Sequence, residues 1–317
     1  MNIVIALIFT DASDLLRVSS FTLGFFLLAL ILRLIPWFTK AFRLWNWMDF
    51  LGHEFSFWDS FRISLMTELG AAISPTAIGG EPIKAGMLYQ RGVSFGESAS
   101  LTSIAAVEDL TFYILGIPVA IFLSSAWRVP AIEQFITNRF AESSNTLTWI
   151  LIILVLIILA IVVIWQTNVF QGLKDKIVEF WQDFKHLYES MLKKGKGRFA
   201  VNVAVDVIHW GARYSVVSAL VLSLGYDADI IKFFVLQWVV FTLMSLVPTP
   251  GATGGAEGVF LIIFGPLLPN SAIGTILIGW RFIDFYLVSI LALIFLSADS
   301  YLSRKYGDAK EEDQLFT

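Results

Sequence analysis

The chain has 317 residues, 57% of them hydrophobic and 15% charged, and its formal net charge is −4. Soluble domains carry about 25% charged residues, so this composition excludes an ordinary soluble enzyme and indicates an all-α integral membrane protein. Because the chain has no cysteine and its three histidines are far apart, disulfides are excluded and we expect no metal site and no cofactor.

The first predicted element is an N-terminal membrane span. Met1–Phe9 is apolar but shorter than the ~20 residues that cross a bilayer, so it is either a remnant span or an interfacial segment. Val18–Phe38 is long enough to span. Arg33 lies near its end, where we expect the side chain to snorkel to the surface. Lys40 and Arg43 follow and indicate that this end is cytoplasmic.

The next apolar segment is interrupted. Phe57–Ile73 runs into SPTAIGGE (residues 74–81) and resumes as a short helix to Arg91. Proline removes a backbone donor and adjacent glycines loosen a helix, so we expect the chain to unwind here. The returning arm would reach about 15 Å, half of a ~30 Å hydrocarbon core. We therefore predict a re-entrant hairpin over residues 57–91; a kinked span followed by an interfacial helix is the alternative.

Two further spans and a basic connector follow. Ser98–Ser124 contains adjacent acids, Glu108 and Asp109, which face different sides of a helix. Leu147–Trp165 is an uncharged linking span, within residues 147–166. The connector 167–198 holds seven basic residues and reads as cytoplasmic. Its apolar residues recur at helical spacing, which predicts an amphipathic helix on the membrane surface or an ordinary linker helix.

The fourth span, Phe199–Leu224, carries a polar stripe. Asp206, His209 and Arg213 are spaced by three and four residues, so they share one helix face. Polar side chains inside a membrane should face the protein interior. The stripe is therefore either part of a translocation path or a buried network that joins helices.

The last third of the chain repeats the earlier pattern. Ile230–Val247 runs into PTPGATGGAE (248–257) and resumes to Gly265, which predicts a second hairpin over residues 230–265. Ala272–Ala298 is the last span. Its Arg281 and Asp284 are three residues apart, and we expect them to pair with each other; a contact from Arg281 to a lipid phosphate is the alternative.

The basic residues give the two halves opposite orientations. Arg304 and Lys305 place the tail, residues 299–317, on the cytoplasmic side with the connector. The first hairpin then enters from the cytoplasm and the second from outside. Repeat 1 (18–124) and repeat 2 (199–298) would thus form an inverted-repeat bundle with two re-entrant broken-helix hairpins. Inverted repeats with discontinuous helices are typical of transporters.

Each interruption contains two adjacent glycines and an acid. These residues are Gly79, Gly80 and Glu81, with Lys84 close behind, and Gly254, Gly255 and Glu257. Either each carboxylate only stabilises the positive N-terminus of its return helix, or the tips form a polar site at mid-depth for an anionic group or a coupling ion. Because the motif occurs in both halves, we favour the polar site.

The tips and the helices after them resemble a known family. The elements are Pro75…Gly79-Gly80-Glu81-Pro82-Ile83-Lys84, Arg91-Gly92-Val93-Ser94, Glu108-Asp109, and Pro248-Thr249-Pro250-Gly251…Gly254-Gly255…Glu257 with Arg281. From Ser13 onward the chain is similar to the flippase-like transmembrane family, also called the lysylphosphatidylglycerol synthase transmembrane domain. Relatives usually carry one more N-terminal span, and many have arginine where this chain has Glu108.

The resemblance implies lipid translocation. In the family's best-known members the membrane unit moves aminoacylated phospholipid between leaflets, and a separate soluble domain synthesises that lipid. The longest polar segment here, residues 167–198, is too short for such a domain. We therefore expect a flippase or scramblase-like protein of the cytoplasmic membrane. Glu81 and Glu257 would hold cationic headgroup portions or coupling protons, while Arg213 and Arg281 would attract phosphate.

Two other functions fit the sequence. The chain could be an ion-coupled carrier of a small soluble anion, or a membrane scaffold for a partner enzyme. We do not expect an enzyme, because no nucleophile–histidine–acid set stands out, and we expect no nucleic-acid binding, because no large basic surface is present. The expected partners are membrane lipids, a second copy of the chain or a lipid-modifying enzyme.

Overall fold

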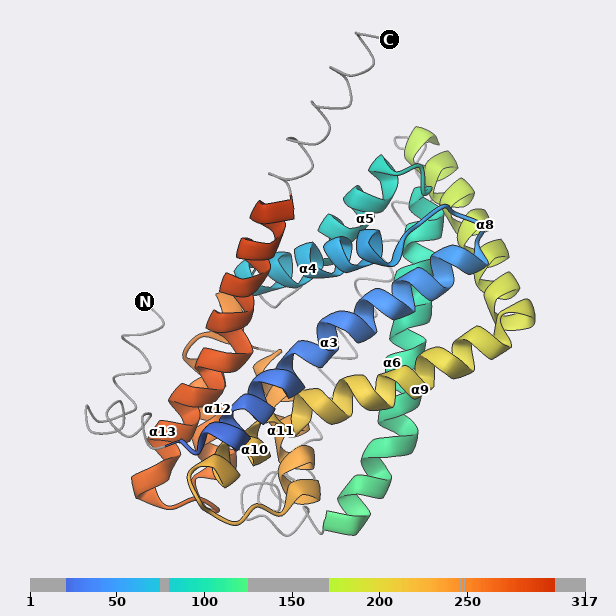
Figure 1. Cartoon of the computed structure of the whole chain (residues 1–317). Coiled ribbons are helices and arrows are strands. Elements are labelled where there is room, and N and C mark those ends of the chain that lie inside the picture. The colour runs from blue at the N-terminus through green and yellow to red at the C-terminus, as the bar shows by residue number, and fades with distance from the viewer. Residues whose placement is uncertain (1–20, 75–79, 125–170, 246, 248, 300–317) are drawn as a thin grey trace, which may run out of the picture.

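A computed structural model describes residues 21–74, 80–124, 171–245, 247 and 249–299. The regular elements in these ranges are all helical, which confirms the all-α class (Figure 1). Met1–Phe9, Gly79, the linking span Leu147–Trp165 and the basic tail lie outside the described residues, so what the sequence predicts for them stays a prediction.

The first described helix, α3 (Leu23–Phe50), is longer than the predicted span, which ends at Phe38. It continues because the polar residues on it are buried against other helices. Arg43 is 7% exposed and Arg33 is 2% exposed. The interpretation that Arg33 snorkels to the surface is therefore wrong, and the cytoplasmic assignment of this end from Lys40 and Arg43 stays a prediction.

Helices α4 (Phe57–Ile73) and α5 (Gly80–Gln90) correspond to the two arms of the first interrupted segment, and they pack against each other. A capping box between Ser56 and the third helical residue begins α4. The start of α5 lies very close to α4, because a Cβ on Gly80 would lie 2.4 Å from the carbonyl oxygen of Thr67. Glycine permits this approach, which holds the tip against the middle of α4.

Helix α6 (Phe95–Ser124) follows, and the connector forms α8 (Gln171–Lys194). On α8, Trp181 is exposed, and a hydrogen bond of 2.8 Å from Lys193 lowers the pKa of the Glu189 carboxyl. An exposed aromatic and exposed charges on one helix fit the amphipathic character that the sequence predicts.

The predicted fourth span is divided into two helices. Helices α9 (Lys196–Tyr214) and α10 (Val216–Ser223) meet at a bend at Ser215. The Ser215 hydroxyl donates to the carbonyl oxygen of Gly211 at 2.7 Å. Such back-bonding competes with the helical ladder and often bends a helix, which accounts for the division.

The second interrupted segment forms α11 (Ile230–Met244), a 3-10 turn (Pro250–Ala252) and α12 (Gly255–Phe264). Helices α11 and α12 pack against each other as α4 and α5 do. Helix α13 (Asn270–Arg281) continues through a π-helical turn, Phe282–Leu287, and the whole helix ends at Asp299. The order of a helix, a packed pair and a long helix therefore occurs twice in the described ranges.

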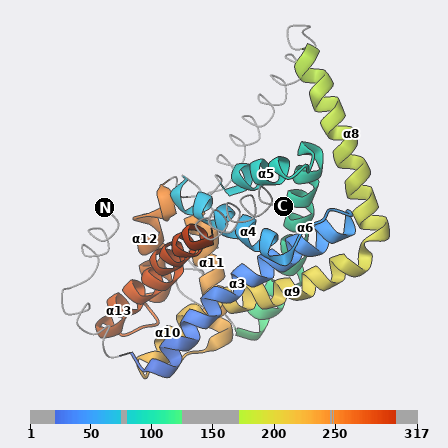
Figure 2. The same ribbon diagram turned by 45° about the horizontal axis from the view of Figure 1, so that its top comes forward.

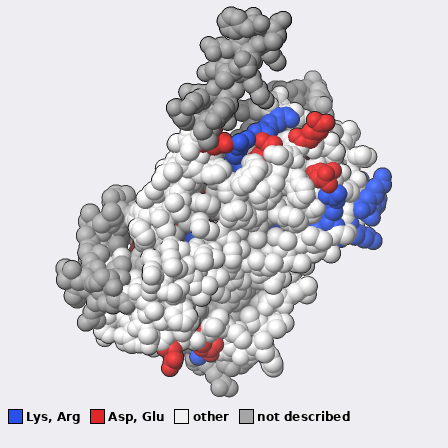
Figure 3. Space-filling view, in the orientation of Figure 1, with Lys and Arg blue, Asp and Glu red and all other residues white. Residues whose placement is uncertain are grey.

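Three described helices are long and apolar enough to cross a membrane: Leu23–Phe50, Phe95–Ser124 and Asn270–Asp299. Large exposed apolar side chains include Phe25, Leu115, Phe122, Ile262 and Ile294. In Figure 3, most charged side chains of the visible face gather at its upper right and at its lower edge, and the band between them shows almost none. This distribution is the one expected of a multi-pass membrane protein.

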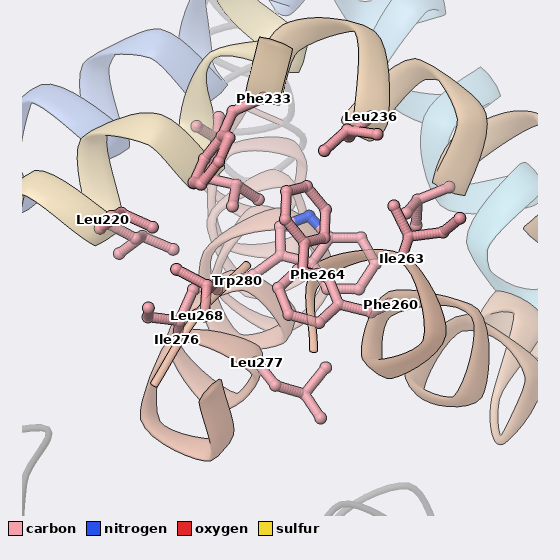
Figure 4. Packing of buried hydrophobic residues seen from close by; sticks show 14 of the residues in the cluster. Leu220, Phe233, Leu236, Phe260, Ile263, Phe264, Leu268, Ile276, Leu277 and Trp280 are labelled. Atoms are coloured by element: carbon pink, nitrogen blue, oxygen red, sulfur yellow. The ribbon is translucent and has the colours of Figure 1, made fainter. Parts of the chain in front are cut away.

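Helix α3 runs through the middle of the bundle. It packs against α4, α9 and α10, and Figures 1 and 2 both show α9 beside it. The largest apolar cluster lies in the second half of the chain, where the rings of Phe260, Phe264 and Trp280 gather (Figure 4). Phe260 stacks on Trp280 with ring centroids 5.0 Å apart. The polar residues are concentrated elsewhere, where α3 meets α4, α6, α9 and α13.

Candidate functional site

Helix α3 supplies the basic side chains of the site. Arg33, Lys40 and Arg43 are separated by seven and three residues, which places them on one face of the helix. Acidic residues from four other helices, α4, α6, α9 and α13, meet them there. A charged side chain at the centre of a membrane helix costs about 2.5–3.5 kcal/mol on insertion scales, so each of these residues needs a partner.

Arg43 lies at the centre of the first group. Its guanidinium binds Glu108 at 2.8 Å, Asp109 at 2.9 Å and, on the same Nη1 atom as Asp109, Asp206. It also donates to the carbonyl oxygen of Ala105 at 2.9 Å. One arginine therefore joins α3 to α6 and to α9.

Glu108 is completely buried, and its other oxygen is also satisfied. The Trp47 indole donates to it at 2.8 Å and the Asn202 amide at 2.9 Å. A carboxylate with this many donors is held rigidly. Glu108 is thus a fixed acceptor that orients Arg43, and its neighbour Asp109 is the more accessible of the two acids, with 32% of its side chain exposed.

Glu68 lies at the centre of the second group. Its carboxylate binds Arg33, lies 3.7 Å from Lys40 and 4.0 Å from Arg213. Arg33 in turn reaches Asp284 on α13 at 2.7 Å. The group therefore connects the first described helix with the last one.

The two groups are neighbours. Between them, the Thr39 hydroxyl and the Nδ1 atom of His209 form a hydrogen bond of 2.8 Å, and both residues are buried. The predicted stripe on α9 does face the interior: Asp206 binds Arg43, His209 binds Thr39, and Arg213 lies beside Glu68.

A cavity of about 140 Å³ opens beside the first group. Because a water molecule occupies about 30 Å³ of liquid, the cavity could hold roughly four or five waters, or a small charged group. Its charged lining consists of Lys40, Arg43, Lys84, Glu81, Glu108 and Asp109. Basic and acidic residues are equal in number, so the cavity suits a ligand that carries both charges.

The two tip acids have different surroundings. Glu81 lines the cavity, has 51% of its side chain exposed, and accepts hydrogen bonds from Thr102 at 2.8 Å and Lys84 at 3.4 Å. Glu257 is 1% exposed. It accepts from the Gly254 amide at 2.8 Å, as a helix cap does, and lies 2.8 Å from Arg281.

Asp284 and Arg281 do not pair with each other, so that prediction is wrong. They lie on either side of the start of the π-helical turn; Asp284 pairs with Arg33, while Arg281 pairs with Glu257 and donates to the carbonyl oxygen of Gly251 at 3.1 Å. Each of the two residues therefore pairs with a residue on another helix and not with the residue one turn away. Gly255, the first residue of α12, packs tightly, because a Cβ there would lie 2.4 Å from a Val247 methyl.

The structure thus brings only part of the predicted residues together. Glu81, Lys84, Glu108 and Asp109 line the cavity, and Gly80 begins the helix that carries the first two. Glu257 and Arg281 form a separate buried pair beside Gly254 and Gly255.

Sequence reasoning missed Lys40, Arg43 and Glu68 as members of the site. The signal that could have found Glu68 is that it lies deep in an apolar arm, Phe57–Ile73, with no basic residue one turn away, whereas the other acid of the arm, Asp59, lies in its first turn next to Arg62.

The chain is similar to known membrane proteins over most of its length. The family described as lysylphosphatidylglycerol synthase TM region matches residues 3–292. A protein of Archaeoglobus fulgidus, named a UPF0104 membrane protein, is 25% identical over 279 residues, which cover 82% of each chain. The family match includes every residue of the cavity and of the two charge groups.

Proposed function

The chain belongs to the family of lysylphosphatidylglycerol synthase TM regions, and from that premise we propose that it translocates phospholipids between the two leaflets of a membrane. The observation that carries the proposal is the cavity of about 140 Å³ with its balanced charges, set among membrane-type helices. A polar headgroup would occupy the cavity while the acyl chains remain in lipid.

The lining residues suggest how a headgroup would be held. The ammonium of Lys84 and the guanidinium of Arg43 would attract a phosphate, and the carboxylates of Glu81 and Asp109 would attract an amine. These groups already pair with one another. A zwitterionic or aminoacylated headgroup would therefore exchange partners with the lining instead of leaving buried charges uncompensated, which would cost several kcal/mol.

The tip of α5 has the closest access to the headgroup. Glu81 is half-exposed and faces the cavity, and Lys84 is one turn behind it on the same helix. The tip of the second pair has another role, because Glu257 is buried as a cap and as the partner of Arg281. The proposal therefore places the headgroup at the first tip, beside α3 and α6, and not between two equivalent tips.

The experiment is a translocation assay with the full chain in liposomes. A fluorescent phospholipid is reduced from outside, so that only lipid arriving in the outer leaflet loses its signal. Wild type should exceed protein-free liposomes. Glu81→Gln combined with Lys84→Gln should reduce the rate at least tenfold, while Glu54→Gln, an exposed acid away from the cavity, should not. A rate equal to that of protein-free liposomes would refute the proposal.

The alternative of a small-anion carrier is less well supported. An anion site should carry an excess of positive charge, but the cavity has as many acids as bases in its lining. Adding free phosphate at millimolar concentration to the same liposomes separates the two functions. Phosphate uptake without lipid movement would favour the carrier.

We also propose the topology in which this translocation takes place. The packed pairs α4–α5 and α11–α12 would be re-entrant hairpins that enter from opposite faces, which makes the two halves inverted repeats. The interruption of each pair at Pro and Gly residues supports this, since irregular backbone at membrane depth is tolerated only where protein or a polar cavity surrounds it. The C-terminus would be cytoplasmic.

A further inference from the structure

Asp109 and Asp206 lie next to each other in the structure. Their carboxylates, from α6 and α9, both bind the Nη1 atom of Arg43. Because one oxygen of each carboxylate contacts the same nitrogen atom, the two carboxylates lie close to each other. Glu108 adds a third acid to the same guanidinium at 2.8 Å. Carboxylates that share a site do not all ionise, because like charges at this distance repel.

The charges of the surrounding groups do not balance. The two neighbouring charge groups, taken together as one network in the described residues, contain the bases Arg33, Lys40, Arg43 and Arg213 and the acids Glu68, Glu108, Asp109, Asp206 and Asp284. The acids therefore exceed the bases by one. The remaining ion pairs near it, Glu81 with Lys84 and Glu257 with Arg281, are balanced. One bound proton would make the network neutral.

The other helices that pack against α9 supply no further charge near Asp206. Helix α10 contains no ionisable residue, and the only one on α11, Lys232, lies in its first turn. Helix α8 meets α9 at its last turn, where Lys193 and Lys194 are exposed. The other ionisable side chains nearby are Tyr113 and Tyr214, which share a hydrogen bond, and His209.

Asp206 has an oxygen that is positioned for a proton. The side chain is completely buried, and its Oδ2 atom has no hydrogen-bond donor among the described residues. The nearby acid on α6 is Asp109, whose carboxylate can only accept. A proton on Asp206 would let this side chain donate an O–H···O hydrogen bond to the Asp109 carboxylate, in place of a contact between two acceptors. The centre of the group is occupied by the Arg43 guanidinium, so a metal cation there would meet a fixed positive charge.

A route for the proton is also present. Asp109 lines the cavity and is partly exposed, whereas Asp206 behind it is not. A proton that enters the cavity from water would reach Asp109 first and pass to Asp206. Because Asp109 and Arg43 both line the cavity, any headgroup that binds one of them changes the electrostatic balance of the pair.

We propose that Asp109 and Asp206 together bind one exchangeable proton, and that its uptake from the cavity is coupled to the binding of a polar headgroup there. The coupling rests on the proposed function, whereas the proton site itself does not. No other bond is made or broken: the proton adds to a carboxylate oxygen from the cavity and leaves through the cavity once the cavity is open to the opposite side of the membrane.

The test of the site is infrared spectroscopy of the full chain in lipid. Wild type at neutral pH should show the carbonyl stretch of a buried protonated carboxylic acid, which shifts in D₂O. Asp206→Asn should remove this band, and Glu54→Gln should leave it unchanged. Asp109→Asn removes the repelling neighbour, so its band should titrate away at a pH lower by about one unit or more.

Two variants keep the test decisive. If Asp206→Asn does not fold, the lower titration pH of the band in Asp109→Asn still tests the shared proton. Asp206→Glu keeps a carboxyl group at this position, so it should retain the band. A wild-type protein without the band, or a band that persists unchanged in Asp206→Asn and Asp109→Asn, would overturn the proton site.

The coupling is tested by a pH gradient across liposomes that contain labelled phospholipid. With one proton coupled, a gradient of one pH unit should change the distribution of lipid between leaflets by about tenfold. Asp109→Asn should abolish this dependence. A band without translocation would refute the proposed function and leave the proton site standing. Translocation that ignores the gradient in a protein without the band would refute the inference and leave the function standing.

Discussion

Glu68 is a single residue whose loss should destabilise the folded protein. It is the one acid of α4 beside Arg33, Lys40 and Arg213. Removing one member of a buried ion pair leaves the other charge uncompensated, at a cost of roughly 3–5 kcal/mol. The side chain is 13% exposed, so some water reaches it and the lower end of that range applies.

We therefore predict that Glu68→Gln lowers the free energy of unfolding by about 3 kcal/mol. Unfolding by denaturant in detergent micelles measures this. The matched control is Glu54→Gln, an exposed acid just before α4, which should change stability by less than about 0.5 kcal/mol. Equal effects of the two substitutions would contradict a supporting role for Glu68.

Glu257 and Arg281 allow a different prediction, because they form an isolated buried pair. Glu257→Gln alone should destabilise the protein by about 3 kcal/mol, since it leaves the guanidinium without a counter-charge. The double variant Glu257→Gln with Arg281→Met should recover most of that loss, because both charges are gone. A double-mutant cycle of unfolding free energies measures the coupling. Losses that simply add would argue that the pair does not interact.

The residues of the site could be predicted only in part. Glu108, Asp109 and Asp206 were identifiable because acids in apolar spans are rare. Their shared partner was not, because Arg43 is separated from Glu108 by 65 residues and from Asp206 by 163. A sequence shows local pairs such as Arg281 and Asp284, and here a partner from a distant helix replaces that local pair.

At the scale of elements, the loop before α12 depends on a glycine. Gly251 has a φ of +61°, and a Cβ there would lie 2.5 Å from the Phe285 ring. Its carbonyl oxygen also accepts from Arg281. Gly251 therefore contacts the π-helical part of α13 through Phe285 and the residue just before it through Arg281.

We predict that Gly251→Ala destabilises the protein by at least 1–2 kcal/mol, roughly the cost of a left-handed conformation for alanine, with the ring clash in addition. The control is Gly258→Ala in α12, where a Cβ meets no atom within 4 Å. Alanine within a helix is favoured by about 0.5–1 kcal/mol, so this control should stabilise. Thermal unfolding of both variants provides the comparison, and the same sign for both would refute the argument.

The sequence predicted the interrupted elements better than the continuous ones. Proline and glycine mark α4–α5 and α11–α12 directly, because these residues act on the local backbone. The bend at Ser215 has no such marker, since a serine in a helix usually leaves it intact. The end of α3 was also missed, because burial of Arg43 by other helices allows the helix to continue beyond the apolar residues.

At the scale of the whole molecule, the proposed inverted topology can be tested with single cysteines, since the chain has no natural cysteine. Glu54→Cys and Gln90→Cys flank the first packed pair and should react with a membrane-impermeant thiol reagent from the cytoplasmic side only. Asp227→Cys and Asn270→Cys flank the second pair and should react from the outside only. All four positions are exposed. Labelling of all four from one side would exclude inverted repeats.

The pair of Arg33 and Asp284 has a consequence for how the protein is made. The two residues are 251 positions apart, so Arg33 leaves the ribosome long before its partner. At roughly 5–20 residues per second, the delay is on the order of ten to fifty seconds. During that time the guanidinium depends on Glu68 alone, and nascent chains that stop before α13 would be expected to remain incompletely assembled and exposed to membrane quality control.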